Sequence, residues 1–327
     1  MKSQLNFNKD LAQCLSEMFS NSREYVNFIM VNLHLGYEAA YRRSKGEVSF
    51  TFHEIIIIAK KLRLSLDSLM KCSYEKSARF DISVIPSNSI SDYIAYYESV
   101  FVEPYENFAM LSHAGKVLFT LATHVSFPPI FLLPYKHLTR FNLFQWVYHF
   151  SPESVELEFK DIQFTEVVIK KQNRIFELMT SAAHLTTSVL SKSIIPFCIE
   201  QINYFKDLGA FTQEDLSNIK SELIMAINDL EKVAKFGRYP LGNRVELYLS
   251  DIDFMSNYIY IKGLDFEQTM IDIYMFHTIE SNDPFFINMH KKWIESQKKY
   301  STLLSGISGV ARSRYFKSQI KLIEEKL

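Results

Sequence analysis

Apolar residues recur with a helical period near the start of the chain. Between Lys9 and Phe19 they stand at positions 11, 12, 15, 18 and 19, which share one face of an α-helix. A second short helix is predicted to about Leu33, with Ser22 as its N-cap. A turn over His34-Leu35-Gly36 is expected to follow, because Gly36 can adopt the positive φ that a tight corner requires.

Three more short helices are predicted before residue 80. The third runs from about Tyr37 to Lys45 and ends at Gly46, by the preference for glycine after a helix C-terminus. Thr51 and Glu54 have the spacing of a capping box and open a fourth helix. A fifth helix is predicted in "LSLDSLM", with Ser65 at its cap. The fourth helix is expected to bury Ile55, Ile58, Ala59 and Leu62.

The pattern changes after residue 80. Residues 81–90 contain Pro86 within a run of Ser and Asn, which predicts a linker. Residues 91–327 are predicted to be mostly helical, and the helical periodicity extends over about 90–125, 138–146, 161–232 and 293–327. The segments "RVELYLSDI" and "NYIYIKG" predict antiparallel strands. The segment "TMIDIYMFHTI" either continues them or forms a helix, and we favour a strand, which gives a β-meander around residues 244–279. The expected fold class is therefore mainly α, with five helices in an N-terminal domain and a larger helical domain that has a small antiparallel sheet near the C-terminus.

Composition restricts the class of protein. Apolar residues make up 47% of the chain and charged residues 22%, which allows a large core and excludes general disorder. The three cysteines are scattered and form no CxxC pair, which is typical of a reducing cytosol. The N-terminus has no apolar signal region, and the longest apolar stretch, 117–133, is broken by His124 and Pro128-Pro129. The sequence therefore predicts a soluble, cytoplasmic protein without a membrane segment.

Charge is distributed unevenly along the chain. Residues 1–79 hold 12 Lys and Arg against 8 Asp and Glu, a net charge of +4. Residues 80–327 hold 24 against 29, a net charge of −5. A basic small domain on an acidic body is expected when only the first part approaches a polyanion.

The second and third predicted helices, joined by a tight turn, have the layout of a helix-turn-helix. In that motif the second helix lies in the DNA major groove, and its first residues meet the base edges. Residues at spacings of one, three, four and seven share roughly one face of the third helix, and these are Tyr37, Glu38, Tyr41, Arg42 and Lys45. Arg can bind guanine, Glu can accept from cytosine, and Tyr can contact phosphate or a thymine methyl. Arg43 and Lys45 are predicted to bind phosphates, so that all six residues form the expected DNA-binding site.

The stretch "EAAYRRSKGEVSFTFHEIIIIAKKLRLSLDSL" resembles the lambda-repressor-like (XRE-type) helix-turn-helix domains of bacterial regulators. More narrowly it is similar to a bacterial group of transcriptional regulators, and "FPPIFLLPYKHLTRFNLFQWV" and "STLLSGISGVARSRYFKSQ" resemble the C-terminal region of that group. The resemblance implies that Tyr37, Glu38 and Arg42 face the bases and that Gly46 ends the recognition helix. It also implies a core behind that helix formed by Ile55, Ile58, Ala59, Leu62 and Leu66.

These observations predict a transcriptional regulator that binds double-stranded DNA as a homodimer, because one recognition helix covers too few base pairs to specify a genomic site. The C-terminal domain would supply the dimer interface and a site for a small-molecule or protein effector. An alternative is a protein-interaction adaptor that keeps the scaffold without reading DNA. It is favoured by acidic Glu38 and by Arg43 or Ser44 where such domains usually bury an aliphatic residue.

The sequence offers little that favours an enzyme. His53-Glu54 begins like HExxH, but the fifth position is Ile57, and the SxxK at Ser217–Lys220 has no SDN or KTG beside it. No catalytic residue, metal or cofactor is therefore predicted. The aromatic segment "FPPIFLLPYKHLTRFNLFQWVYHF" has two readings, a core element with a proline-set corner or an apolar ligand pocket or dimer face.

Overall fold

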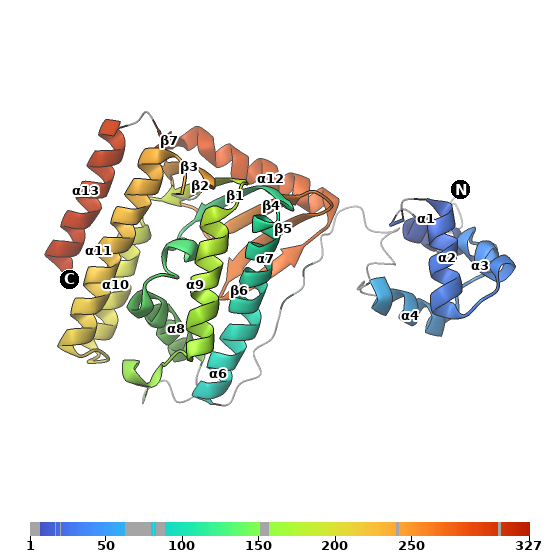
Figure 1. Cartoon of the computed structure of the whole chain (residues 1–327), viewed down its shortest axis with the longest axis horizontal. Coiled ribbons are helices and arrows are strands. Elements are labelled where there is room, and N and C mark those ends of the chain that lie inside the picture. Colours follow the sequence, from blue (N-terminus) through green and yellow to red (C-terminus); the bar gives the residue numbers. More distant parts are fainter. Residues whose placement is uncertain are drawn as a thin grey trace, which may run out of the picture. The chain divides into compact units, whose positions relative to one another are not determined.

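The computed structural model describes residues 7–16, 18–19, 21–62, 80, 82, 89–150, 157–239, 242–306 and 309–327. The chain divides into two compact units, Met1–Arg79 and Phe80–Leu327. Figure 1 colours the elements of both along the sequence. None of the described helices is long and apolar enough to cross a membrane.

The N-terminal unit contains four described helices, α1 (Phe7–Ser16), α2 (Ser22–Leu33), α3 (Tyr37–Ser44) and α4 (Phe52–Leu62). The predicted fifth helix, with Ser65 and Leu66, lies outside the described residues. The four helices enclose a small apolar core of Leu11, Leu15, Tyr25, Val26, Ile29, Ala40, Phe50, Ile58 and Ala59. The partly buried Ile55 and Leu62 pack against it, so the predicted core positions of α4 face inward.

Local signals fix the ends of these helices. The predicted capping box of α4 is confirmed, because the Thr51 N–H donates to Glu54 Oε2 at 2.7 Å and the Glu54 N–H donates to Thr51 Oγ1 at 3.2 Å. At the start of α2 the cap was predicted one residue late. Asn21, not Ser22, is the N-cap, and its Oδ1 accepts from the Glu24 N–H at 2.9 Å.

The C-terminal unit contains both helices and strands. Its α-helices are α6 (Ile90–Tyr97), α7 (Glu103–His113), α8 (Lys136–Phe150), α9 (Glu166–Ser181), α10 (Ile194–Asp207), α11 (Gln213–Phe236), α12 (Pro284–Gln297) and α13 (Gly309–Lys326). A π-helical turn, η2 (Glu98–Val102), joins α6 to α7, and 3-10 turns lie at η3 (Pro129–Phe131), η5 (Phe159–Asp161) and η6 (Lys298–Tyr300). Its strands are β1 (Val117–His124), β2 (Leu185–Ser191), β3 (Arg244–Ser250), β4 (Tyr258–Gly263), β5 (Glu267–Ile273), β6 (His277–Ser281) and β7 (Ser301–Leu303).

All seven of these strands form one mixed sheet in the order β6-β5-β4-β1-β2-β3-β7. The central strands β1, β2 and β3 are parallel, with Leu121 opposite Thr187 and Thr187 opposite Glu246. Helices α8 and α9 connect β1 to β2, and α10 and α11 connect β2 to β3. The outer strands β4, β5 and β6 pair antiparallel in succession, and β7 pairs antiparallel with β3.

The predicted fold class is wrong, because the sheet has seven strands, is mixed rather than purely antiparallel, and spans the middle of the unit as well as its C-terminal part. Strands β1 and β2 lie in segments predicted as helix. Both are central and parallel, and their last residues are buried in succession, so the alternation that identifies a half-exposed strand is missing. The start of the meander was also predicted incorrectly, because β3 pairs with β2 and β7 rather than with β4.

The two faces of the sheet are covered differently. Helices α8 to α11 and α13 share one large core with Leu190, Val245 and Leu247 of the strands. On the opposite face, α12 packs its Ile287 and Ile294 against Leu121 and Tyr260. Figure 1 shows this arrangement, with α12 above the strands and α8 and α9 below them.

The aromatic segment around residues 127–147 belongs to the large core. Pro128 and Pro129 set the corner at η3, and Phe131, Phe144 and Trp146 are buried there. Of the two readings left open by the sequence, the structure supports a core element with a proline-set corner.

Candidate nucleic-acid interface

Helices α2 and α3 are joined by a three-residue turn. The positive φ of this turn was predicted for Gly36, but His34 adopts it with φ 54°, and its N–H donates to the Met30 carbonyl. Gly36 instead has φ −67° and is the N-cap of α3. The corner is therefore closed by a left-handed residue directly after α2, a conformation that histidine tolerates better than most non-glycine residues.

Five of the six predicted DNA-binding residues are exposed on α3 or directly after it: Tyr37, Glu38, Tyr41, Arg42 and Lys45. The rings of Tyr37 and Tyr41 stack with their centroids 6.0 Å apart. Lys45 Nζ lies 5.5 Å from the centre of the Tyr41 ring. Arg42 Nε is 3.7 Å from Glu47 Oε2, and both side chains are more than half exposed, at 55% and 54%. These contacts align aromatic and basic groups along one exposed face of α3.

Arg43 lies apart from the other five. Its side chain is only 16% exposed, and its guanidinium forms two contacts with Glu54, Nη2 to Oε1 at 3.1 Å and Nε to Oε2 at 3.2 Å. Its Nη1 also donates to the Ala39 carbonyl at 3.4 Å. Arg43 thus occupies the inward position near the end of α3 and ties α3 to the start of α4.

Glu54 therefore has two roles, of which the sequence showed one. Its Oε2 accepts from the Thr51 N–H of the capping box and from Arg43, while Oε1 faces Arg43 alone. Local spacing revealed the capping box. The pairing with Arg43, eleven residues away, depends on how α3 folds against α4 and has no local signal in the sequence.

Gly46 fixes the end of α3 by a close backbone approach. Its φ is +68°, and a Cβ at this position would lie 2.7 Å from Lys9 Cα and 2.9 Å from the Asn8 carbonyl oxygen. A larger residue would have to push α1 away, and nearby the Asn8 Nδ2 donates to Ser49 Oγ at 2.6 Å. The glycine is needed both for its φ and for the space that it leaves to α1.

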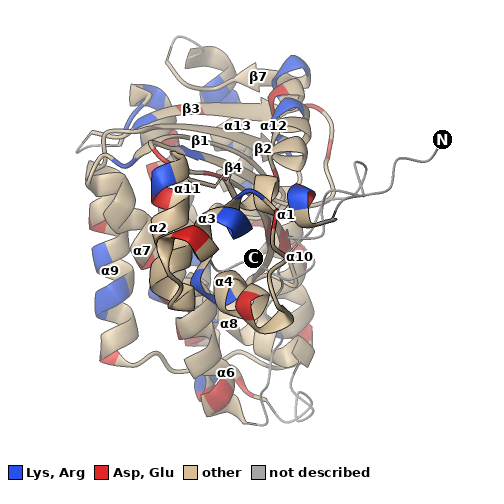
Figure 2. Ribbon diagram, turned by 90° about the vertical axis from the view of Figure 1, so that its right-hand side faces the viewer, with Lys and Arg blue, Asp and Glu red and all other residues tan. Residues whose placement is uncertain are grey.

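The electrostatic character of this face is mixed rather than strongly basic. Arg42 and Lys45 stand beside Glu38 and Glu47, and the basic part of α3 appears in blue in Figure 2. Such a face attracts DNA phosphates only at its basic end. Any preference for one DNA sequence over another would therefore depend on close contacts with the bases.

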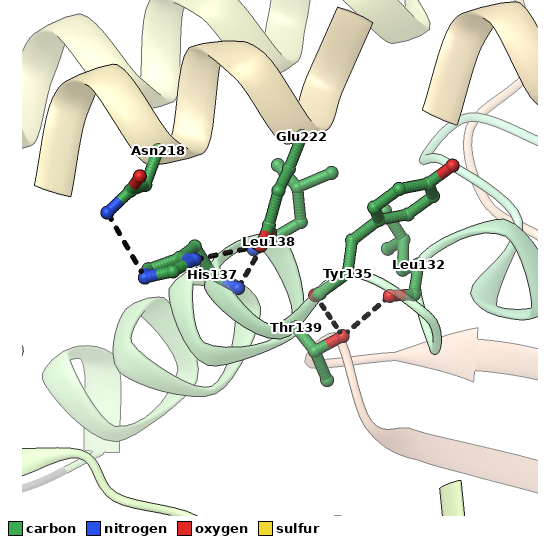
Figure 3. Close-up of polar contacts among 7 residues, drawn as sticks. All are labelled: Leu132, Tyr135, His137, Leu138, Thr139, Asn218 and Glu222. Carbon is green, nitrogen blue, oxygen red and sulfur yellow. Dashed lines mark hydrogen bonds and ion pairs between the residues drawn. The ribbon is translucent and has the colours of Figure 1, made fainter. Parts of the chain in front are cut away.

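The C-terminal unit contains a second polar cluster, shown in Figure 3. Glu222 of α11 accepts from the backbone N–H groups of His137 and Leu138, at 2.7 and 2.9 Å, and Glu222 Oε1 lies 2.8 Å from His137 Nδ1. His137 Nε2 lies 3.4 Å from the side-chain nitrogen of Asn218. A carboxylate at the first turn of α8 satisfies N–H groups that have no partner within the helix. The cluster thus holds α8 against α11. Beside His137 it has the Asn218 amide, at the position where a catalytic triad would need a nucleophile.

Comparison of the chain with known protein families, with curated proteins and with solved structures finds no match.

Proposed function

We propose that this protein is a sequence-specific DNA-binding transcriptional regulator that acts as a homodimer. The observation that carries the proposal is the presentation of α3, a short helix after a tight turn, with five polar or aromatic side chains exposed on it or directly after it. A helix of this kind can enter the major groove, which admits one α-helix.

Four of these five residues receive a role from their chemistry and placement, and Arg43 behind them receives another. Tyr37 and Glu38, at the start of α3, and Arg42 one turn later face the base edges. Arg42 can donate two hydrogen bonds to a guanine, which gives about 1–3 kcal/mol of discrimination against another base. Lys45 binds a phosphate and sets the register without reading sequence. Arg43 supports the site from behind, because its pair with Glu54 fixes the angle between α3 and α4.

The C-terminal unit would supply the second half of the mechanism. Two copies of α3 must reach half-sites about one helical turn apart, roughly 34 Å, and a dimer of the large unit would set that spacing. An effector that binds one dimer geometry more tightly than another would change DNA affinity by the same free energy.

The proposal is tested by selection from random duplexes with the full-length protein, followed by titration of the selected duplex at several salt concentrations. A two-fold symmetric motif should be enriched. Lys45→Ala should reduce the slope of log K against log salt by about 0.9 for each phosphate that the protein no longer neutralises. Arg42→Ala should relax the preference at one base position in each half-site. Lys170→Ala, on the exposed face of α9, serves as the matched control and should change neither. Absence of enrichment at low salt would refute the proposal.

A protein-interaction adaptor is the second candidate. It is favoured by two large apolar side chains exposed in the same unit, Val31 at 71% and Phe52 at 69%. Exposed apolar groups of this size are typical of protein contact sites, although single ones also occur on ordinary surfaces. A partner bound through them should depend weakly on salt, whereas a DNA complex should weaken steeply.

A further inference from the structure

The outward face of α12 carries a row of large apolar side chains. Phe285, Met289 and Trp293 are 70%, 52% and 39% exposed, although the same helix buries Phe286, Ile287, His290 and Ile294 on its inward side. The three exposed residues stand four apart and therefore follow one another along a single face. A contiguous apolar row on an otherwise well-packed helix is typical of a protein contact site.

This row is nearly symmetric about its centre. Met289 has an aromatic residue four positions before it and another four positions after it. If a second copy of α12 lies antiparallel across the first, Met289 meets Met289 and Phe285 meets Trp293 at both ends. A two-fold contact requires such a self-complementary surface, in which each residue contacts the partner's equivalent or its counterpart. The 14 residues of α12 form a helix about 21 Å long, so all three positions can engage at once.

The near-symmetry of the row favours a second copy over an unrelated protein as its occupant, and the position of Phe80 agrees with this choice. The C-terminal unit begins at Phe80, and its ring lies edge-on against Phe286 of α12, with the centroids 4.7 Å apart. The segment that joins the two units therefore enters the C-terminal unit beside the helix that carries the row. In a dimer formed across α12, both segments start close to the two-fold axis.

Charge on this face is compatible with self-association. Between Phe285 and Trp293 the exposed polar residues are Asn288 and Lys292, with no acidic residue among them. In the antiparallel pair each Lys292 lies near the partner's Phe285, and its ammonium can form a cation–π contact with that ring. The two Lys292 residues lie on opposite sides of Met289 and do not face each other.

We propose that α12 is the homodimer interface of this protein, with Met289 on the two-fold axis and Phe285 of each copy packed on Trp293 of the other. The need for a dimer rests on the proposed DNA-binding function, but the interface is defined by α12 alone. Its test therefore uses no DNA.

The test is sedimentation of the full-length protein with substitutions on two exposed helix faces. Met289→Lys places two ammonium groups on the axis and should raise the dimer dissociation constant about 100-fold, since residues at the centre of an interface dominate its affinity. Phe197→Lys, at a 52% exposed position on α10, is the matched control and should sediment like the wild type. Met289→Cys should form an intermolecular disulfide on oxidation, because residues on a two-fold axis meet their own copies. Wild-type protein oxidised in parallel measures the background from the native cysteines.

A wild-type protein that is monomeric at tens of micromolar, or a Met289→Lys variant that dimerises like the wild type, would overturn the interface. If Met289→Lys is monomeric but no duplex is enriched by the wild type, the interface holds and the DNA-binding function fails. If a symmetric motif is enriched and Met289→Lys remains dimeric, the function holds and α12 is not the interface.

Discussion

The ion pair between Arg43 and Glu54 allows a direct test of how α3 is held against α4. Arg43→Met keeps most of the apolar stem of the side chain but removes the guanidinium, leaving a carboxylate that is only 15% exposed without its main partner. Loss of one member of a fully buried pair costs about 3–5 kcal/mol, and exposed pairs contribute about 0–1 kcal/mol. At the intermediate burial of this pair we expect about 2 kcal/mol.

The assay is hydrogen exchange of the full-length protein, followed on peptides that cover residues 37–62. A loss of about 2 kcal/mol corresponds to exchange roughly 30-fold faster in α3 and α4, because 1.4 kcal/mol is a factor of ten. Glu54→Gln should accelerate exchange less, since the amide oxygen can still accept from the Thr51 N–H. Combined with Arg43→Met, it should add little, because the pair is already broken.

The exposed pair between Arg42 and Glu47 supplies the control. Glu47→Gln removes an ion pair at 3.7 Å whose members are more than half exposed, so exchange in the same peptides should change less than about twofold. If Arg43→Met and Glu47→Gln accelerate exchange equally, burial of the Arg43 pair does not stabilise the junction of α3 and α4 and the reasoning fails.

Two further predictions concern stability. Gly46→Ala should destabilise the N-terminal unit by about 3 kcal/mol, because of its positive φ and the clash with Lys9. Gly115→Ala, with φ +71° and open space around the glycine, should cost only about 1 kcal/mol. Hydrogen exchange of peptides that cover α1 and β1 compares the two variants, and equal costs would contradict the close approach at Gly46. In the C-terminal unit burial lowers the pKa of three histidines to about 4, namely His124, His184 and His290. Between pH 6.5 and 4 the unfolded chain therefore binds more protons than the folded chain. The free energy of unfolding should decrease as the pH is lowered through this window, by up to about 1.4 kcal/mol per pH unit for each histidine. Asp272 has the opposite effect and offsets the contribution of one histidine. Burial raises its pKa to about 6, so its neutral form stabilises the folded state, and this stability is lost as the pH rises through 6. Urea unfolding followed by tryptophan fluorescence from pH 7.5 to 4.5 measures the net slope, and a constant midpoint would refute the assignment.

The sequence by itself determined the features that depend on near neighbours. The capping box of Thr51 and Glu54, the end of α3 before Gly46 and the inward face of α4 were all readable, because each involves residues within one or two helical turns. The exposed face of α3 follows from the same periodicity, since its members recur at helical spacing.

The tertiary structure decided what depends on distant partners. Strands β1 and β2 are strands because each pairs with neighbours on both sides and is covered by helices, and this burial removed the alternation that would have revealed them. In the sequence, Arg43 cannot be distinguished from its basic neighbours. In the structure, α4 places Glu54 against it. Periodicity tells which side of an element is apolar, but only the packing of elements far apart in the chain determines what meets that side.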